Sequence, residues 1–226
     1  MEDKKLKFLF KYPTMGRPDW FCETLGTYYK LLSGKHDYQF LVSLNEDDPT
    51  MLSADIIRHM MTQDNLIFRT GLHKSKVQAI NADMDEVDDF DILVLVSDDM
   101  IPQQAGFDLI IAEDMLTHFP EMDGALHYND GCCGQDKCIT LSIMGKKMYD
   151  HFGYIYHPDY RSLFCDNEFT DVVRDMNKVR YFPSVIIKHD WKGGRGGDHV
   201  YKRNGALWKQ DQATYNRRKE LNFPVR

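Results

Sequence analysis

The sequence of 226 residues lacks the features of membrane and secreted proteins. No stretch approaches the roughly 20 consecutive apolar residues of a spanning helix, so we expect no membrane span. The charged residues 1–5 lead into an apolar run of only seven residues, 6–12, which is unlike a secretory leader. The five cysteines are an odd number, which favours reduced thiols over a disulfide framework. These absences predict a cytoplasmic protein, which means the host cytoplasm if the source is viral.

Three common enzyme motifs are also missing. The sequence has no P-loop, no GxGxxG after the first predicted strand and no HExxH, which argues against the commonest NTPases, dehydrogenases and zinc proteases. Disorder is disfavoured because 42% of the residues are hydrophobic and 12% are aromatic. This composition and length predict one sizeable core, which corresponds to one domain with appendages.

Strand and helix patterns alternate through the first 100 residues. Predicted strands cover 6–12, 38–44, 66–69 and 91–96, and predicted helices cover 20–32, 56–61 and 76–84. The run 91–96 is continuously aliphatic, so it predicts a central strand covered on both faces. Such alternation indicates an open α/β sheet that binds ligands beyond the carboxyl ends of its strands. The loops with Arg17, residues 45–48 and the pair Asp98 and Asp99 should therefore converge.

Asp98 and Asp99 directly follow the most apolar strand. Adjacent carboxylates at a sheet edge provide hard oxygen ligands, which suit a Mg²⁺ or Mn²⁺ ion that shares its remaining positions with a diphosphate. An ordinary acidic turn that caps a following helix would look the same in the sequence.

Four segments, 12–18, 43–48, 74–81 and 96–99, occur in the order in which family 2-like nucleotide-sugar glycosyltransferases of the GT-A fold have their donor-site motifs. The sequence resembles that family over most of residues 6–190, including members of viral and bacterial type. The resemblance implies an open mixed α/β sheet, Rossmann-like in its N-terminal half, with flanking helices. It implies donor contacts by Pro13, Thr14, Arg17, Glu46, Asp47, Lys76, Asn81, Ser97 and Asp98.

The acidic pair departs from the usual DXD motif, because no residue separates the two acids and Met100 takes the place of a third. The resemblance still implies a Mn²⁺ or Mg²⁺ cofactor held by Asp98, Asp99 or both. It also implies a histidine ligand near the end of the domain, for which His189 is the candidate. A structural role for His189 is the alternative.

The resemblance implies a catalytic base within 165–169, where Asp166 and Glu168 are the candidates. One of these carboxylates would accept the proton of the acceptor hydroxyl during an inverting transfer. Acids in the first turn of a helix often only cap it, and that reading stays open.

An acceptor-side segment is implied at His127, Tyr128, Asn129 and Asp130. Lys192 and Arg195, in a glycine-rich stretch, are candidates for a lid that neutralises the leaving diphosphate. A plain flexible loop explains the same glycines.

The charge is unevenly distributed along the chain. Residues 188–226 contain ten Lys or Arg and four acids, whereas 1–187 carry a formal charge of -13. We therefore divide the chain into a transferase domain, 1–190, and a basic, aromatic-rich extension or lid, 191–226. The extension could contact a nucleotide donor or a DNA strand, or pack its aromatic side chains on the body.

These features predict a metal-dependent enzyme that transfers a sugar from a nucleoside-diphosphate sugar to a hydroxyl acceptor. A glycan, a small molecule or hydroxymethylpyrimidine in DNA would supply that hydroxyl. A non-catalytic nucleotide- or carbohydrate-binding module and a nucleotidyltransferase are the alternatives.

Overall fold

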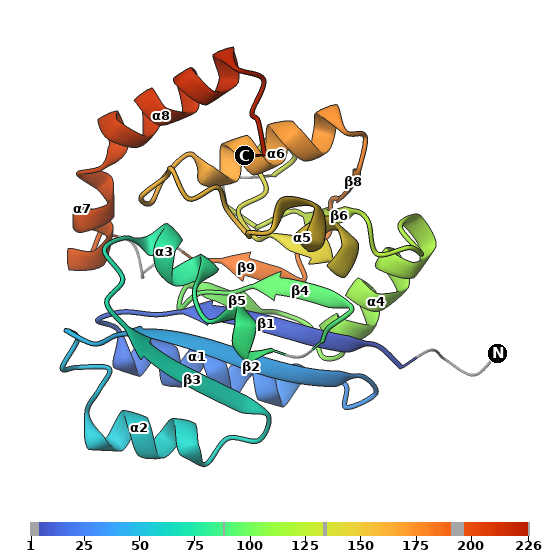
Figure 1. Ribbon diagram of the computed structural model, residues 1–226. Coiled ribbons are helices and arrows are strands. Elements are labelled where there is room, and N and C mark those ends of the chain that lie inside the picture. The colour runs from blue at the N-terminus through green and yellow to red at the C-terminus, as the bar shows by residue number, and fades with distance from the viewer. Residues whose placement is uncertain (1–4, 88, 133–134, 191–196, 226) are drawn as a thin grey trace.

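A seven-stranded mixed sheet forms the centre of the computed structural model, which describes residues 5–87, 89–132, 135–190 and 197–225 (Figure 1). The strand order is β3-β2-β1-β4-β7-β6-β8, and antiparallel β7 joins two parallel groups. The strands are β1 (Lys7–Pro13), β2 (Asp37–Asn45), β3 (Leu66–Gly71), β4 (Ile92–Leu95), β6 (Ala125–Tyr128), β7 (Ile143–Gly145) and β8 (Val179–Phe182). A separate antiparallel pair consists of β5 (Met100–Pro102) and β9 (Ile187–His189).

Helices cover both faces of the sheet, as Figure 1 shows. They are α1 (Pro18–Leu31), α2 (Ala54–Met61), α3 (Lys76–Asn81), α4 (Phe107–His118), α5 (Lys146–Phe152), α6 (Cys165–Asp175), α7 (His199–Gly205) and α8 (Trp208–Glu220), with a short 3-10 helix at Met84–Glu86. None of the helices in the described ranges is long and apolar enough to cross a membrane.

The sheet has a hydrophobic core on each face because side chains alternate along its central strands. Phe8, Phe10 and Tyr12 of β1 belong to the core under α1 and α4, whereas Leu9 belongs to the core under α3, α5 and α6. β4 is central and fully buried, as its aliphatic sequence predicts.

The four predicted strands are present, with ends that differ by one or two residues. The predicted helix at 76–84 is shorter, because α3 ends at Asn81 and Asp83 takes a left-handed conformation with φ 62°. No helix directly follows Asp98 and Asp99. The chain turns through a hydrogen bond from Met100 N to Ser97 O (3.0 Å) into β5, so the two acids do not cap a helix there.

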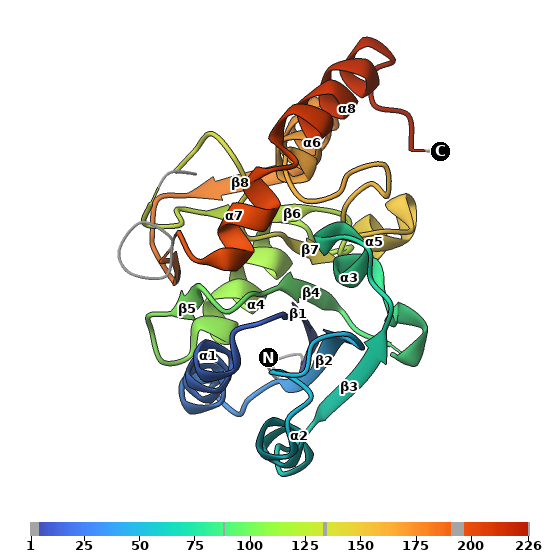
Figure 2. The same cartoon turned by 90° about the vertical axis from the view of Figure 1, so that its left-hand side faces the viewer.

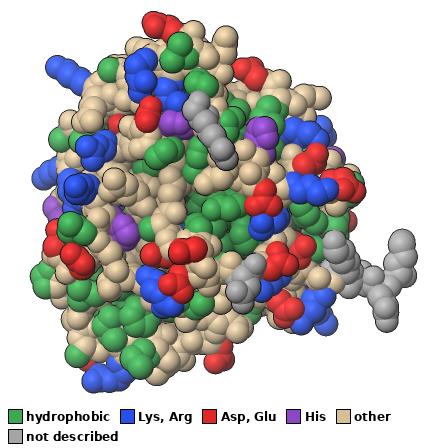
Figure 3. Space-filling view, viewed as in Figure 1, with side chains coloured by type: hydrophobic (Ala, Val, Ile, Leu, Met, Phe, Trp, Pro, Cys, Tyr) green, Lys and Arg blue, Asp and Glu red, His purple; other side chains and the backbone are tan. Residues whose placement is uncertain are grey.

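The C-terminal helices lie against the rest of the molecule. Figure 2 shows α7 above the end of β1, with α8 alongside α6. In Figure 3 basic side chains gather over the side of the molecule where α7 and α8 lie, and acidic side chains lie beside basic ones elsewhere on that face.

Candidate active site at the carboxyl edge of the sheet

The loops after β1, β2 and β4 meet, as the alternating pattern predicts. Thr14 donates from Oγ1 to Asp98 Oδ1 (2.9 Å), which joins the first loop to the acidic pair. Gly16 N donates to Asp48 Oδ2 (2.6 Å), which joins the first loop to the second. One edge of the sheet therefore gathers polar groups from three separate parts of the sequence.

Asp98 is buried, with 3% of its surface exposed. Burial raises the pKa of Asp98 to about 7, since the hydrogen bond from Thr14 and the charge of Arg17 only partly oppose desolvation. The backbone oxygen of Asp98 also accepts a hydrogen bond from Thr24 Oγ1 (2.8 Å), which fixes the turn. The site therefore contains a carboxyl group that titrates near neutral pH.

Asp99 has the opposite electrostatic character although it is the next residue. Burial alone would raise its pKa, but His189 and the hydroxyls of Ser97 and Tyr201 hold the pKa well below its usual value. Ser97 Oγ donates to Asp99 Oδ1, and Tyr201 OH donates to Oδ2. Asp99 is thus a stable anion within the site.

His189 reaches Asp99 through the β5–β9 pairing, in which Met100 lies opposite His189. The imidazole lies between two carboxylates, with Nε2 3.7 Å from Asp99 Oδ2 and Nδ1 3.8 Å from Asp130 Oδ2. Burial would lower the pKa of His189, but Asp130 and Asp99 raise it to about 9. Two of the three predicted metal-binding residues, Asp99 and His189, therefore lie side by side, with His189 as the counter-charge of Asp99.

Arg17 lies beside this group and is bound by α7. Its Nε and NH2 atoms donate to Asp198 (2.8 and 2.9 Å), and NH1 is 3.9 Å from Asp99 Oδ2. The guanidinium also stacks on the rings of Trp20 and Tyr201 at 5.0 and 4.9 Å from their centroids. The α7 helix thus closes one side of the site, through residues to which the sequence analysis assigned no role.

Gly16 permits this close approach of α7. It has φ +67°, and a Cβ atom there would lie 2.7 Å from His199 Nε2. The positive φ favours glycine, and any larger residue would also displace the end of the His199 side chain.

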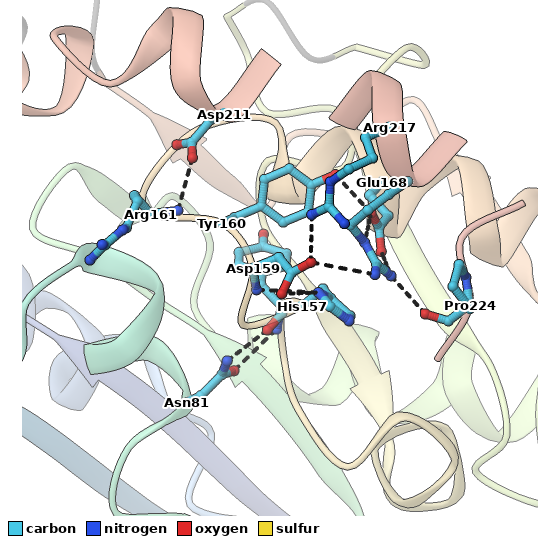
Figure 4. Close-up of polar contacts among 11 residues, drawn as sticks. Asn81, His157, Asp159, Tyr160, Arg161, Glu168, Asp211, Arg217 and Pro224 are labelled. Atoms are coloured by element: carbon cyan, nitrogen blue, oxygen red, sulfur yellow. Dashed lines mark hydrogen bonds and ion pairs between the residues drawn. The ribbon is translucent and has the colours of Figure 1, made fainter. Parts of the chain in front are cut away.

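The two predicted base candidates differ sharply. Asp166 is half-buried in the first turn of α6, where its Oδ1 accepts a hydrogen bond from Asn167 N (3.0 Å). Glu168 is buried, and its carboxylate accepts hydrogen bonds from Arg218 Nε (2.7 Å), Arg218 NH2 (2.8 Å) and Tyr160 OH (2.7 Å) (Figure 4). The carboxylate of Glu168 already accepts three hydrogen bonds, two of them from Arg218, so it has a role in attaching α8 to α6.

The positive charge of Lys76 affects the pKa of a residue in the first turn of α6 and the pKa of His189, the partner of Asp99. Burial raises the pKa of the Cys165 thiol well above its usual value, and the charge of Lys76 opposes this shift. The same charge opposes the rise in the pKa of His189. Lys76 therefore lies within electrostatic range of both the residue next to Asp166 and the partner of Asp99.

Other predicted donor residues are placed differently. Glu46 and Asp47 are exposed in a turn, and the buried Asp48 makes the contact with the first loop instead. Asn81 uses its side chain to hold the backbone of residues 155 and 156, with a hydrogen bond from Nδ2 to Tyr156 O (2.6 Å). Asn81 is thus a structural contact between α3 and the chain before α6. Pro13 is the last residue of β1 and precedes Thr14.

The predicted acceptor segment is mostly internal. His127 is buried, and Tyr128 packs on Phe182 and donates from its hydroxyl to Asp114 Oδ2 (2.5 Å). The Oδ1 atom of Asn129 accepts a hydrogen bond from Gly131 N. Asp130 alone of these four residues reaches the acidic pair, through His189. The burial of Tyr128 in the core speaks against an acceptor contact by its side chain. Lys192 and Arg195 lie outside the described residues.

The basic extension is partly neutralised by acids of the body. Arg217 pairs with Asp159 (2.8 Å), Lys219 with Asp171 (3.2 Å) and Arg218 with Glu168. Two of its aromatic side chains also contact the body, since Trp208, which is half-exposed, and Tyr215 pack on the ring of Phe164. Much of the extension is therefore used for folding.

Solved glycosyltransferases resemble this structure. A mannosyltransferase of Pyrobaculum calidifontis in complex with GDP-Man and Mn²⁺ aligns with 96% of this chain and 65% of its own, with a TM-score of 0.70 and 12% identity. S. aureus TarS 1–349 in complex with UDP-GlcNAc aligns with 86% of this chain and 60% of its own, with a TM-score of 0.64 and 14% identity. A Drosophila β1,4-galactosyltransferase 7 complex with manganese, UDP-Gal and xylobiose aligns with 88% and 74%, with a TM-score of 0.57 and 12% identity.

This chain spans less than two thirds of the length of the first two. No protein-family model and no curated protein matches the sequence itself. At such low identities the likeness establishes the architecture, which is the GT-A fold of glycosyltransferases, as the sequence resemblance implies.

Proposed function

We propose that this protein is a metal-dependent glycosyltransferase that moves a sugar from a nucleoside-diphosphate sugar to a hydroxyl acceptor. One observation carries the proposal: the buried pair Asp98 and Asp99 lies at the carboxyl edge of a GT-A sheet, beside Arg17 and His189. The related structures were solved with GDP-Man, UDP-GlcNAc and UDP-Gal, two of them also with manganese, and this supports the same substrate class here.

The residues present suit Mn²⁺ or Mg²⁺. Asp98 and Asp99 offer carboxylate oxygens and His189 offers an imidazole nitrogen, all of them ligand types for these ions. Within the described ranges, no three His, Cys, Asp or Glu side chains form a ready metal cluster. Such an arrangement fits an ion held by one or two carboxylates that takes other ligands from a diphosphate, whose growing charge the ion would offset.

In this proposal Arg17 changes partners during donor binding. Its guanidinium donates two hydrogen bonds to Asp198. A diphosphate would compete with Asp198 for these donors, because arginine binds phosphate and carboxylate in the same two-pronged way. Thr14 and Ser97 remain candidates for contacts with the nucleotide sugar, because their hydroxyls donate hydrogen bonds to Asp98 and Asp99 and so lie at the site. Lys76 adds positive charge near the donor.

Asp166 is the base in this proposal. It would accept the acceptor's proton while the hydroxyl oxygen attacks the anomeric carbon and the diphosphate leaves from the opposite side. The sequence resemblance implies this inverting course. Glu168 is the less suitable candidate because its carboxylate already accepts hydrogen bonds from Arg218 and Tyr160.

A glycan or small-molecule hydroxyl is the acceptor favoured over DNA. Affinity for DNA comes largely from lysines and arginines that neutralise phosphates. Three basic residues of the extension, Arg217, Arg218 and Lys219, are paired with acids of the same chain, which reduces the charge available for DNA.

A thermal-shift panel of UDP, GDP, CDP and TDP and their sugars, with and without Mn²⁺ or Mg²⁺, tests the proposal, because a ligand that binds the native state raises its stability. We expect a metal-dependent shift with one nucleotide class, followed by sugar transfer that Asp98→Asn abolishes and Asp166→Asn slows by roughly 10²- to 10⁴-fold. Asp175→Asn, an exposed acid at the end of the same helix as Asp166, is the matched control.

Each alternative function would give a different result in these assays. Binding of a nucleotide sugar without turnover would favour a non-catalytic module. Release of pyrophosphate from a nucleoside triphosphate would favour a nucleotidyltransferase. Full activity in both Asp98→Asn and Asp166→Asn would refute the assignment of the site.

A further inference from the structure

The helix α8 is bound to the chain on both sides of Asp166. Before Asp166, the carboxylate of Asp211 accepts backbone hydrogen bonds from Arg161 N (2.9 Å), Ser162 N (2.8 Å) and Leu163 N (2.7 Å). Figure 4 shows Asp211 above the loop that carries Arg161. The last of these donors is only three residues from Asp166, so α8 fixes the backbone that leads into the first turn of α6.

After Asp166, Arg218 of α8 holds Glu168. Only 5% of the Arg218 side chain and 6% of the Glu168 side chain are exposed. Arg218 NH2 also donates to Pro224 O (2.8 Å), which fixes the segment after α8 to the same guanidinium (Figure 4). A buried, two-pronged ion pair has a narrow geometry, so it sets the position of the first turn of α6 relative to α8.

The opposite side of the loop is bound to α3. Asn81 Oδ1 accepts hydrogen bonds from Ile155 N (2.9 Å) and Tyr156 N (3.2 Å), and Val77 N donates to Arg161 O (3.1 Å). The loop before α6 is therefore held between α8 and the helix that begins at Lys76. This loop connects the proposed base with a proposed donor residue.

The residue type at position 211 indicates how α8 is attached to the loop before α6. Asp211 is fully buried, and its carboxylate accepts hydrogen bonds from three backbone N–H groups of this loop. Attachment of a helix by apolar contacts avoids the cost of desolvating a charge. Charged hydrogen bonds add direction, because each fixes a donor to within a few tenths of an ångström. The hydrogen bonds to Asp211 therefore fix the position of the loop more closely than apolar packing of α8 would.

We propose that Asp211 is a positioning residue for the transfer reaction, and that α8 holds Asp166 at the distance at which it can accept the acceptor's proton. This inference rests on the proposed function. Asp211 touches no reacting atom. It acts through the backbone of residues 161–163, and Arg218 supports it through Glu168.

The test compares Asp211→Asn with Gln212→Ala, an exposed neighbour on α8. In Asp211→Asn an amide NH₂ replaces one acceptor oxygen and faces the backbone donors. We expect kcat to fall by roughly 10- to 100-fold, because a displacement of about 1 Å costs on this order. The Kd of the donor, measured by titration calorimetry, should stay within about twofold, because the acidic pair is untouched. Gln212→Ala should match the wild type in both values.

A double-mutant cycle separates positioning from general damage. If Asp211 acts through Asp166, the double variant Asp211→Asn/Asp166→Asn should be no slower than Asp166→Asn alone. Multiplicative losses would overturn the inference, as would a raised donor Kd with an unchanged kcat. If Asp211→Asn does not fold, Asp211→Glu replaces it, because this variant keeps the charge and shifts it by one methylene.

A failure of the proposed function can be distinguished from a failure of this inference alone. In that case the wild type transfers no sugar with any donor, and the inference falls with it. Failure of the inference alone leaves wild-type transfer intact, and Asp211→Asn then retains full kcat.

Discussion

Asp98→Asn should make the metal-free protein more stable while it removes transfer. Asp98 is almost fully buried, and burial raises its pKa from 3.8 to about 7. In the unfolded chain the same carboxyl ionises near its ordinary pKa. Between these two values the native state holds a proton that the unfolded state has released, so stability falls as the pH rises.

The size of the effect follows from the shift. A difference of roughly three pKa units corresponds to about 4 kcal/mol above pH 7, and to almost nothing near pH 4. Asparagine at position 98 keeps an oxygen that can accept the hydrogen bond of Thr14. The stability gained by removing the ionisable carboxyl should therefore be largely retained. We therefore expect the variant to gain about 2–4 kcal/mol at pH 8, which raises the melting temperature by roughly 5–15 °C in a chain of this length.

Urea unfolding at pH 4.5 and pH 8 in the presence of a chelator measures this difference. Asp99→Asn is the control, because the pKa of Asp99 is held low by His189, Ser97 and Tyr201 in spite of its burial. The ionised form of Asp99 stabilises the fold at pH 8, so its replacement should cost stability there. Equal destabilisation by both variants would refute the reasoning.

Three further outcomes follow from other buried groups. Burial lowers the pKa of Lys11 from 10.5 to about 7, so wild-type stability relative to Lys11→Met should rise as the pH increases from 7 to 10, as measured by urea unfolding. Glu168→Gln removes the counter-charge of buried Arg218, and should cost about 3 kcal/mol and lower the melting temperature by roughly 6–12 °C, as measured by calorimetry. Gly16→Ala places a methyl group at φ +67° and 2.7 Å from His199 Nε2, so it should strain the first loop, displace the His199 side chain and raise the donor Kd in a titration.

Local sequence patterns predicted the sheet well because its central strands are strongly apolar. The run 91–96 has aliphatic side chains for both cores, and β4 indeed lies at the centre of the sheet. The loop after β1 then reaches the acidic pair, and the loop after β2 reaches the first loop, because parallel strands end at the same edge. No local pattern predicted the short pair β5 and β9, whose three-residue strands lie far apart in the sequence.

The difference between Asp166 and Glu168 could not be predicted from their own neighbourhood. Both are acids in the first turn of α6, and the spacing alone does not distinguish them. Glu168 is distinguished by Arg218, which lies 50 residues later in the sequence. Asp198 and Tyr201 were missed as site residues for the same reason, because only the folded position of α7 brings them to Arg17 and Asp99.

Two groups of buried charges differ sharply in their electrostatic surroundings. The carboxylate of Glu168 lies against a cation and accepts three hydrogen bonds, as expected of a group selected to hold the fold. Asp98 is equally buried, yet its surroundings leave the ionised form at a disadvantage, so its pKa rises towards neutrality. In the proposed function, a bound cation would supply the missing positive charge. The raised pKa of Asp98 therefore supports a cation-binding role, and Mn²⁺ should stabilise the wild type but not Asp98→Asn in a thermal-shift titration.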